Sequence, residues 1–135
     1  HVVVCGHYNC GGVKAAMSPP GRMLVDHWLQ VVRDVQLRHL TELDALPTEQ
    51  QQFSRLVELN VLEQVFQLSR TPIVRNSWLK GRRPILHGIV YDVNDGLLKE
   101  VVSGVDGEDR ALELRATVAR EIVTVPPTLH KADAI

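Results

Sequence analysis

The sequence has little of what would assign a function from composition alone. Its 15 Lys and Arg residues are matched by 16 Asp and Glu residues, so the basic excess of a nucleic-acid-binding domain is missing. No apolar run approaches the roughly 18 residues of a membrane span. The only two cysteines, Cys5 and Cys10, are too few and too close for the disulfide framework of a small secreted protein. We therefore expect no nucleic-acid partner, no membrane span, and a reducing compartment, either the cytoplasm or an organelle matrix.

The order of apolar and polar residues predicts an α/β fold. Residues 1–5 form a continuous β-branched run, which is typical of a parallel strand buried on both faces. Apolar residues at helical spacing, turn signals and further β-rich runs predict the other elements. These are helices over 23–40, 51–68 and 108–123, a short helix from Thr71-Pro72 to about residue 80, a connection over 41–52, and a hairpin of strands 84–93 and 97–102.

We expect one domain over residues 1–124 and a loose tail over 125–135. Its sheet should be mostly parallel, flanked by helices, with an antiparallel edge hairpin. Two or three strands are few for an open sheet. The chain also begins with His1 instead of Met. We therefore expect a preceding segment, or another subunit, to supply further strands.

The sharpest local feature is His7-x-x-Cys10, in a glycine-rich turn that directly follows the first predicted strand. Ligands of open α/β sheets bind at the carboxyl ends of strands. Imidazole nitrogen and thiolate sulfur are both good Zn²⁺ ligands, but a zinc site needs three or four protein donors. Cys5 is a poor third donor, because a cysteine inside a strand is expected to pack as a small apolar residue.

Three segments, in the same order along the chain, resemble the β-class carbonic anhydrases. The first segment, 1–13 (HVVVCGHYNCGGV), is similar to the stretch that carries the second and third protein zinc ligands of that family. Residues 58–65 (ELNVLEQV) resemble a characteristic helix of the family, and residues 87–98 (HGIVYDVNDGLL) resemble its last hairpin. The resemblance covers about residues 1–102.

This resemblance implies a fold, a reaction and a ligand set. The reaction is the reversible hydration of CO2 to bicarbonate and a proton by zinc-bound hydroxide, with Zn²⁺ as cofactor. His7 and Cys10 would be metal ligands, and the N–H of Gly11 would help to hold substrate, although a turn glycine explains Gly11 equally well. No further catalytic residue is identifiable. The family's remaining cysteine ligand and its Asp-Arg pair lie upstream, and no Cys-x-Asp-x-Arg pattern occurs in this chain.

Tyr91 matches a tyrosine that helps to form a second, non-catalytic bicarbonate pocket in some members of the family. That pocket also needs Trp and Arg residues from the upstream region. A half-buried strand residue is an equally good interpretation of Tyr91.

Other candidates have simpler interpretations. His87 is expected to be a packed, hydrogen-bonded strand residue. His27 and His39, on the first long helix, are expected at surface or interface positions. Trp28 and Trp78 are expected to anchor the core or an interface.

The resemblance further implies a homodimer or homotetramer with active sites at the subunit interface. A different class of function is a catalytically inactive, carbonic anhydrase-like scaffold or interaction subunit, which would explain the missing third ligand. A structural zinc protein completed by another chain is a third hypothesis. The intact His7, Cys10 and glycine-rich loop favour the enzyme over an inactive relative.

Overall fold

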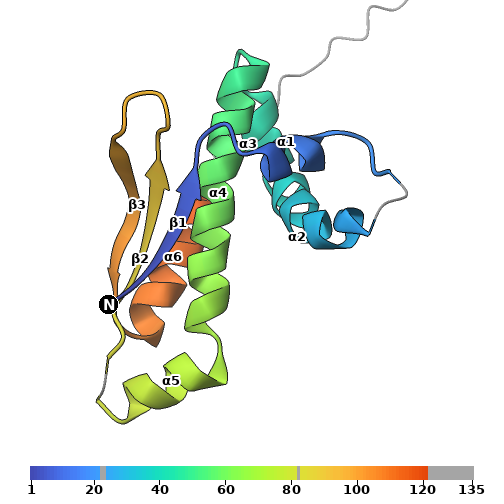
Figure 1. Ribbon diagram of the computed structural model, residues 1–135. Helices are drawn as coiled ribbons and strands as arrows, with labels where there is room; N and C mark the ends of the chain where they lie inside the picture. The colour runs from blue at the N-terminus through green and yellow to red at the C-terminus, as the bar shows by residue number, and fades with distance from the viewer. Residues whose placement is uncertain (22–23, 82, 122–135) are drawn as a thin grey trace, which may run out of the picture.

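The computed structural model of the chain describes residues 1–21, 24–81 and 83–121. Strands and helices follow the predicted order (Figure 1). The elements are β1 (Val2–His7), α1 (Gly11–Met17), α2 (Val25–Arg38), α3 (Leu40–Asp44), α4 (Glu49–Ser69), α5 (Pro72–Leu79), β2 (Leu86–Tyr91), β3 (Leu98–Val105) and α6 (Glu108–Glu121). The predicted tail, 125–135, lies outside the described residues.

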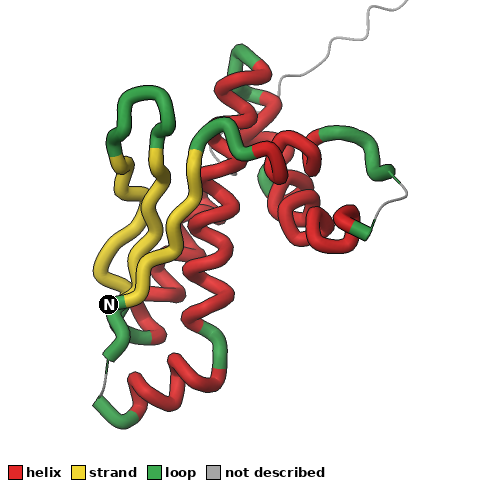
Figure 2. The backbone as a smooth tube through the Cα atoms, in the orientation of Figure 1, coloured by secondary structure: helices red, strands yellow, loops and turns green. Residues whose placement is uncertain are grey.

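The three strands form one mixed sheet in the order β1-β2-β3 (Figure 2). β1 pairs with β2 in parallel, and β2 pairs with β3 in antiparallel orientation, so the predicted α/β fold with an edge hairpin is confirmed. The turn between β2 and β3 closes with a hydrogen bond from the Asp92 N–H to the Leu97 carbonyl, 2.9 Å long. Gly96 adopts a φ of 76°, a left-handed conformation that favours glycine.

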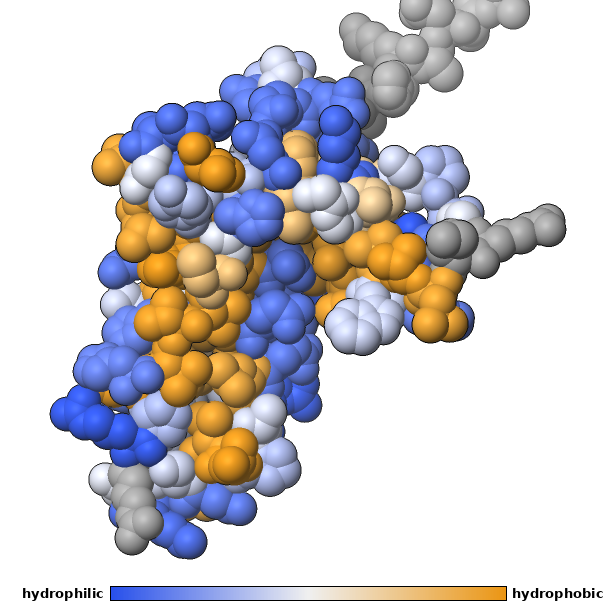
Figure 3. Space-filling model, viewed as in Figure 1, coloured by the Kyte–Doolittle hydropathy of each residue, from blue (hydrophilic) through white to orange (hydrophobic). Residues whose placement is uncertain are grey.

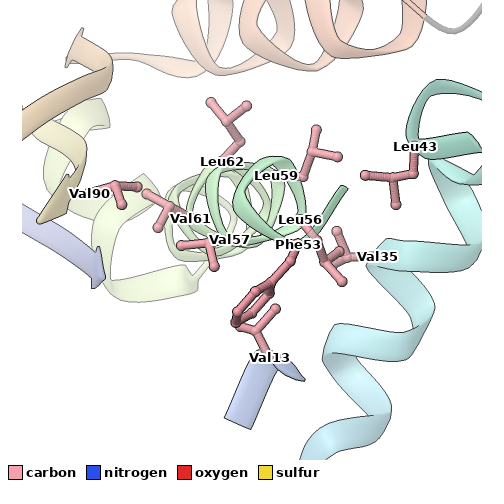
Figure 4. Packing of buried hydrophobic residues seen from close by; sticks show 10 residues of the cluster. All are labelled: Val13, Val35, Leu43, Phe53, Leu56, Val57, Leu59, Val61, Leu62 and Val90. Carbon is pink, nitrogen blue, oxygen red and sulfur yellow. The ribbon is translucent and has the colours of Figure 1, made fainter. Parts of the chain in front are cut away.

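Helix α4 lies at the centre of the molecule and carries most of the core. Its side chains project towards the sheet, towards α1, and towards α2 and α3 (Figure 4). We predicted a helix with apolar residues on or near one face, but eleven of its 21 residues are buried. A helix surrounded by neighbours on most sides is apolar around most of its circumference.

Two glycines allow α4 to approach the sheet closely. A Cβ atom at Gly6 of β1 would lie 2.6 Å from Cγ2 of Val61, and a Cβ atom at Gly88 of β2 would lie 2.8 Å from Cγ1 of the same residue. Both distances are shorter than non-bonded carbon atoms allow. Gly6 and Gly88 therefore face α4, and the residues next to each of them in its strand face the opposite side, since side chains alternate along a strand.

The strand β1 differs from the prediction of a strand buried on both faces. Only one face of β1 packs against α4. Val3, on the other face, is 51% exposed, and Val2, the first residue of the strand, is 39% exposed. Cys5, predicted to pack as a small apolar residue, is exposed on the other face. Figure 3 shows hydrophobic side chains gathered over the strands and over α2 in this view.

Several helix predictions need correction. The segment 41–52, predicted to be mostly a connection, contains α3 and the start of α4. His39, expected at a surface or interface position, is buried at the junction of α2 and α3, and its Nδ1 is 3.3 Å from Oε2 of Glu42. In the described ranges, no helix combines the length and the apolar character that crossing a bilayer requires.

The two tryptophans have different environments. Trp78 is half-buried against the core, and its indole N–H donates to the Pro84 carbonyl at 2.7 Å, as an anchor residue should. Trp28 is 82% exposed on α2, so it does not anchor the core of this chain. Its predicted role at an interface stays a prediction.

Candidate metal centre

His7 and Cys10 flank a tight loop that leads from β1 into α1. His7 is the last residue of β1, and Cys10 is the N-cap of α1. Asn9 makes the turn between them with a φ of 57°, in the left-handed region that asparagine tolerates better than most residues. The chain crosses α4 as it passes from β1 to α1 (Figure 1). The motif therefore lies at the carboxyl end of a strand, as predicted.

The imidazole of His7 is oriented by its own loop. Nδ1 lies 3.0 Å from the carbonyl oxygen of Tyr8, and a carbonyl can only accept, so Nδ1 carries the proton. The unprotonated Nε2 is then the nitrogen that can bind a metal. Metal-binding histidines commonly donate their other ring N–H to a backbone carbonyl in this way.

Cys10 and Gly11 follow at the start of α1. The Cys10 side chain is half-buried against the core, and its sulfur is not in a disulfide. A Cβ atom at Gly11 would meet no other atom within 4 Å, so the backbone is open on that side. The first N–H groups of a helix have no partner within the helix, so the N–H of Gly11 is available to a ligand.

The donor set fits part of a zinc site. Imidazole nitrogen and thiolate sulfur are the donors that zinc prefers, and the loop carries one of each. Within the described ranges, no group of three His, Cys, Asp or Glu side chains is placed to hold a metal ion. Cys5 is not placed with His7 and Cys10 in such a group. A zinc site at this loop would need a further protein donor.

Tyr8, which lies between the two predicted ligands, joins a network that the sequence analysis missed. Its hydroxyl donates to Oε1 of Glu58 on α4, at 2.5 Å. The same carboxylate accepts from Nζ of Lys99 on β3 at 2.6 Å and from the guanidinium of Arg55 at 3.1 Å. Glu58 is only 7% exposed, and a carboxylate that is nearly buried needs such partners.

The contacts within this network determine the protonation states of Glu58 and Tyr8. Burial alone would raise the pKa of Glu58, but the hydrogen bonds from Lys99, Tyr8 and Arg55 outweigh burial and lower the pKa below its ordinary value. Burial, followed by the hydrogen bond to Glu58, raises the pKa of the Tyr8 hydroxyl. Glu58 is therefore an anion and Tyr8 a neutral donor around neutral pH.

Tyr91 lies beside the candidate ligands. It is the register partner of His7 across the parallel strand pair, and its carbonyl accepts from the N–H of Tyr8 at 2.9 Å. The residue is 37% exposed. His87 lies further back on β2, where Nδ1 is 2.9 Å from the hydroxyl of Ser103, so the predicted hydrogen-bonded strand histidine is what the structure has.

Comparison with known proteins identifies the family. Residues 1–98 match the sequence model of the carbonic anhydrase family. The structure of a β-carbonic anhydrase from Coccomyxa in complex with acetazolamide superposes with a TM-score of 0.79 and 32% sequence identity, over 93% of this chain and 59% of that chain. The chain belongs to the β-class carbonic anhydrase family.

Other members of the family give a consistent picture. A carbonic anhydrase from Emericella nidulans is 46% identical over 101 residues, which are 75% of this chain and 44% of the relative. A carbonic anhydrase from Candida albicans is 35% identical over 74% of this chain and 36% of its own length. A tetrameric β-carbonic anhydrase from Sordaria macrospora superposes with a TM-score of 0.69 and 33% identity, over 77% of this chain and 53% of that chain. This chain thus spans less than half the length of the Emericella nidulans and Candida albicans relatives.

Proposed function

We propose that this chain contributes two zinc ligands to a carbonic anhydrase that interconverts CO2 and bicarbonate. The observation that carries the proposal is the geometry of the loop after β1. There, His7 presents Nε2 because its Nδ1 proton is held by the Tyr8 carbonyl, and Cys10 follows at the start of α1. The matched region, 1–98, contains every residue of this loop.

The residues of the chain have separate tasks in this proposal. Zinc, when bound, lowers the pKa of a bound water towards neutrality and so makes hydroxide available for attack on CO2. His7 and Cys10 hold the metal, the former as a neutral imidazole and the latter as a thiolate. Gly11 leaves its side of the backbone open, so its N–H can donate to an oxygen of the substrate. The third protein donor comes from outside the described residues.

The proposal includes assembly into a dimer or tetramer. The Sordaria macrospora relative is described as tetrameric. In this chain, large apolar side chains are exposed on β1 and at the start of α2, where the N-cap Leu24 is 83% exposed and Trp28 is 82% exposed. Large apolar side chains gathered at a surface often mark an interaction surface. We further propose a reducing compartment, cytoplasm or organelle matrix, because two closely spaced cysteines do not form the disulfide framework of a secreted protein.

A catalytically inactive scaffold subunit is the second candidate. The observation that favours it is that the described residues supply two metal donors where a catalytic zinc site needs three. Bicarbonate regulation through Tyr91 also stays a prediction, supported by the position of Tyr91 beside His7.

Zinc content and CO2 hydration, measured on the protein as its source produces it, test the proposal. We expect about one zinc per active site, and loss of both zinc and stopped-flow hydration activity in His7→Ala and Cys10→Ser. His27→Ala is the matched control, because His27 is an exposed histidine on α2 and its removal should change neither quantity. Zinc bound at full stoichiometry without hydration activity would favour the scaffold. Zinc content unchanged in His7→Ala and Cys10→Ser would refute both roles.

A further inference from the structure

The loop between the two proposed zinc ligands is attached to the rest of the molecule through Tyr8, a residue in the middle of the loop. The N–H of Tyr8 donates to the carbonyl of Tyr91 on β2 at 2.9 Å, and the Tyr8 hydroxyl donates to Glu58 on α4 at 2.5 Å. One residue therefore ties the loop to both a strand and a helix. The contact with Glu58 spans 50 residues of sequence.

Alternation along β1 explains why Tyr8 reaches α4 while His7 does not. Gly6 faces α4, since a Cβ atom there would point at Val61. His7 therefore faces the opposite side and Tyr8 faces α4 again. The Tyr8 side chain is thus held against α4, and the imidazole of His7 lies on the opposite, open face of the sheet.

Glu58 is itself immobilised, so it can serve as a fixed anchor. Lys99 of β3 and Arg55 of α4 both donate to its carboxylate, and Arg55 also bonds Glu42 of α3. A buried carboxylate with donors from three directions has little freedom to move. The position of the Tyr8 hydroxyl is therefore set by α3, α4 and β3 together.

We propose that Tyr8 is a positioning residue of the metal centre, which fixes the spacing of His7 and Cys10 through its hydrogen bond to Glu58. The inference rests on the proposed zinc site, because the loop matters only if both of its ends bind metal. Zinc requires its donors close to 2.0–2.3 Å in tetrahedral directions. A loop that can drift at its centre meets that requirement in a smaller fraction of its conformations.

The test uses the protein that its source produces, after the bound metal has been removed. This metal-free protein is titrated with Co²⁺, whose visible absorption reports ligand geometry. Loss of a supporting partner around metal ligands typically costs about 10- to 100-fold in affinity. We expect Tyr8→Phe to weaken Co²⁺ binding by about tenfold, the lower limit, and to change the absorption bands of the bound ion. Trp78→Phe is the matched control, since it also removes one aromatic side-chain hydrogen bond, at the far end of the molecule. It should leave the bands and the affinity as they are.

Glu58 variants establish the route of the effect. Glu58→Gln keeps an oxygen that can accept from Tyr8 and should retain most of the Co²⁺ affinity, whereas Glu58→Leu should lower it as Tyr8→Phe does. In the Glu58→Leu background, Tyr8→Phe should have no further effect, as a double-mutant cycle requires of two residues that act through one bond. If Glu58→Leu does not fold, Tyr8→Phe added to Glu58→Gln should still weaken binding about tenfold, since the bond is then intact before the change.

Two results would overturn the inference. One is a Tyr8→Phe protein with the affinity and absorption bands of the parent, and the other is a Trp78→Phe protein weakened to the same degree. The zinc site itself is judged separately. If His7→Ala and Cys10→Ser bind Co²⁺ as the parent does, the proposed function fails. If they lose Co²⁺ and Tyr8→Phe does not, only the positioning role fails.

Discussion

Gly88→Ala tests how tightly α4 is packed on the sheet. The added methyl would lie 2.8 Å from Cγ1 of Val61, 3.0 Å from Cγ1 of Val102 and 3.1 Å from Cγ2 of Val65. Ordinary carbon–carbon contacts are about 3.5–4.0 Å, so all three contacts are too short. Because the methyl is enclosed from three directions, no single neighbour can relieve the clash.

The cost follows from the stiffness of these neighbours. Val61 and Val65 are 2% and 0% exposed, and a β-branched side chain in a helix has one strongly preferred rotamer. The helix must therefore move away from β2. Inserting a methyl into a well-packed core typically costs about 1–3 kcal/mol, and we expect Gly88→Ala near the upper end of that range.

Urea unfolding, followed by circular dichroism, measures this cost. Gly12→Ala is the matched control, because Gly12 lies inside α1 and its added methyl would meet only ordinary contacts at 3.8 and 3.9 Å. It should raise the free energy of unfolding by less than about 1 kcal/mol, the helix-interior difference between alanine and glycine, because Gly12 lies in the first turn of α1. The packing argument would be refuted if Gly88→Ala unfolded at the same urea concentration as the parent.

Two further predictions concern helix α4 and a buried histidine. Thr48→Ala should lower the free energy of unfolding by about 1 kcal/mol, because the Thr48 side chain caps α4 by accepting from the N–H of Gln51. Thr48→Ser, which keeps the acceptor, should cost much less in the same urea assay, and equal costs would contradict the capping role. Burial lowers the pKa of His39, so the unfolded chain binds more protons than the folded one and stability should fall as pH drops below about 6.5. His39→Gln should flatten the profile of unfolding free energy against pH between 5 and 8, and a variant with the parent's slope would show that another group is responsible.

Most elements of the fold could be predicted from sequence because their signals are local. The β-branched run of β1, the Asn94-Asp95-Gly96 turn and the helical spacing of α2 and α4 each determine one element without help from distant residues. The errors concern burial, which depends on neighbours. A run such as that of β1 predicts two covered faces, yet a single helix covers only one of them here. His39 was expected at a surface or interface position because the packing of α3 against α4 could not be foreseen.

The candidate site was predictable only in part. His7-x-x-Cys10 and the glycines after it carry a local pattern, and the structure places them at a strand's carboxyl end as expected. The Tyr8–Glu58 contact was missed because it joins residues 50 positions apart. One signal could have indicated it: Glu58 lies at helical spacing within an apolar series, next to Val57 and three residues before Val61. A carboxylate in that position must find a partner.

The packing of α4 and the geometry of the ligand loop depend on the same face of one helix. Glu58 and Val61 are three residues apart, so they lie on neighbouring turns of one face. A Cβ atom at Gly6 or Gly88 would lie 2.6 or 2.8 Å from the Val61 side chain, and Glu58 accepts a hydrogen bond from Tyr8. A displacement of α4 away from the sheet therefore also moves the carboxylate away from the Tyr8 hydroxyl. Gly88→Ala should accordingly weaken Co²⁺ binding as well as stability, whereas Thr48→Ala, which changes only the start of the helix, should reduce stability alone.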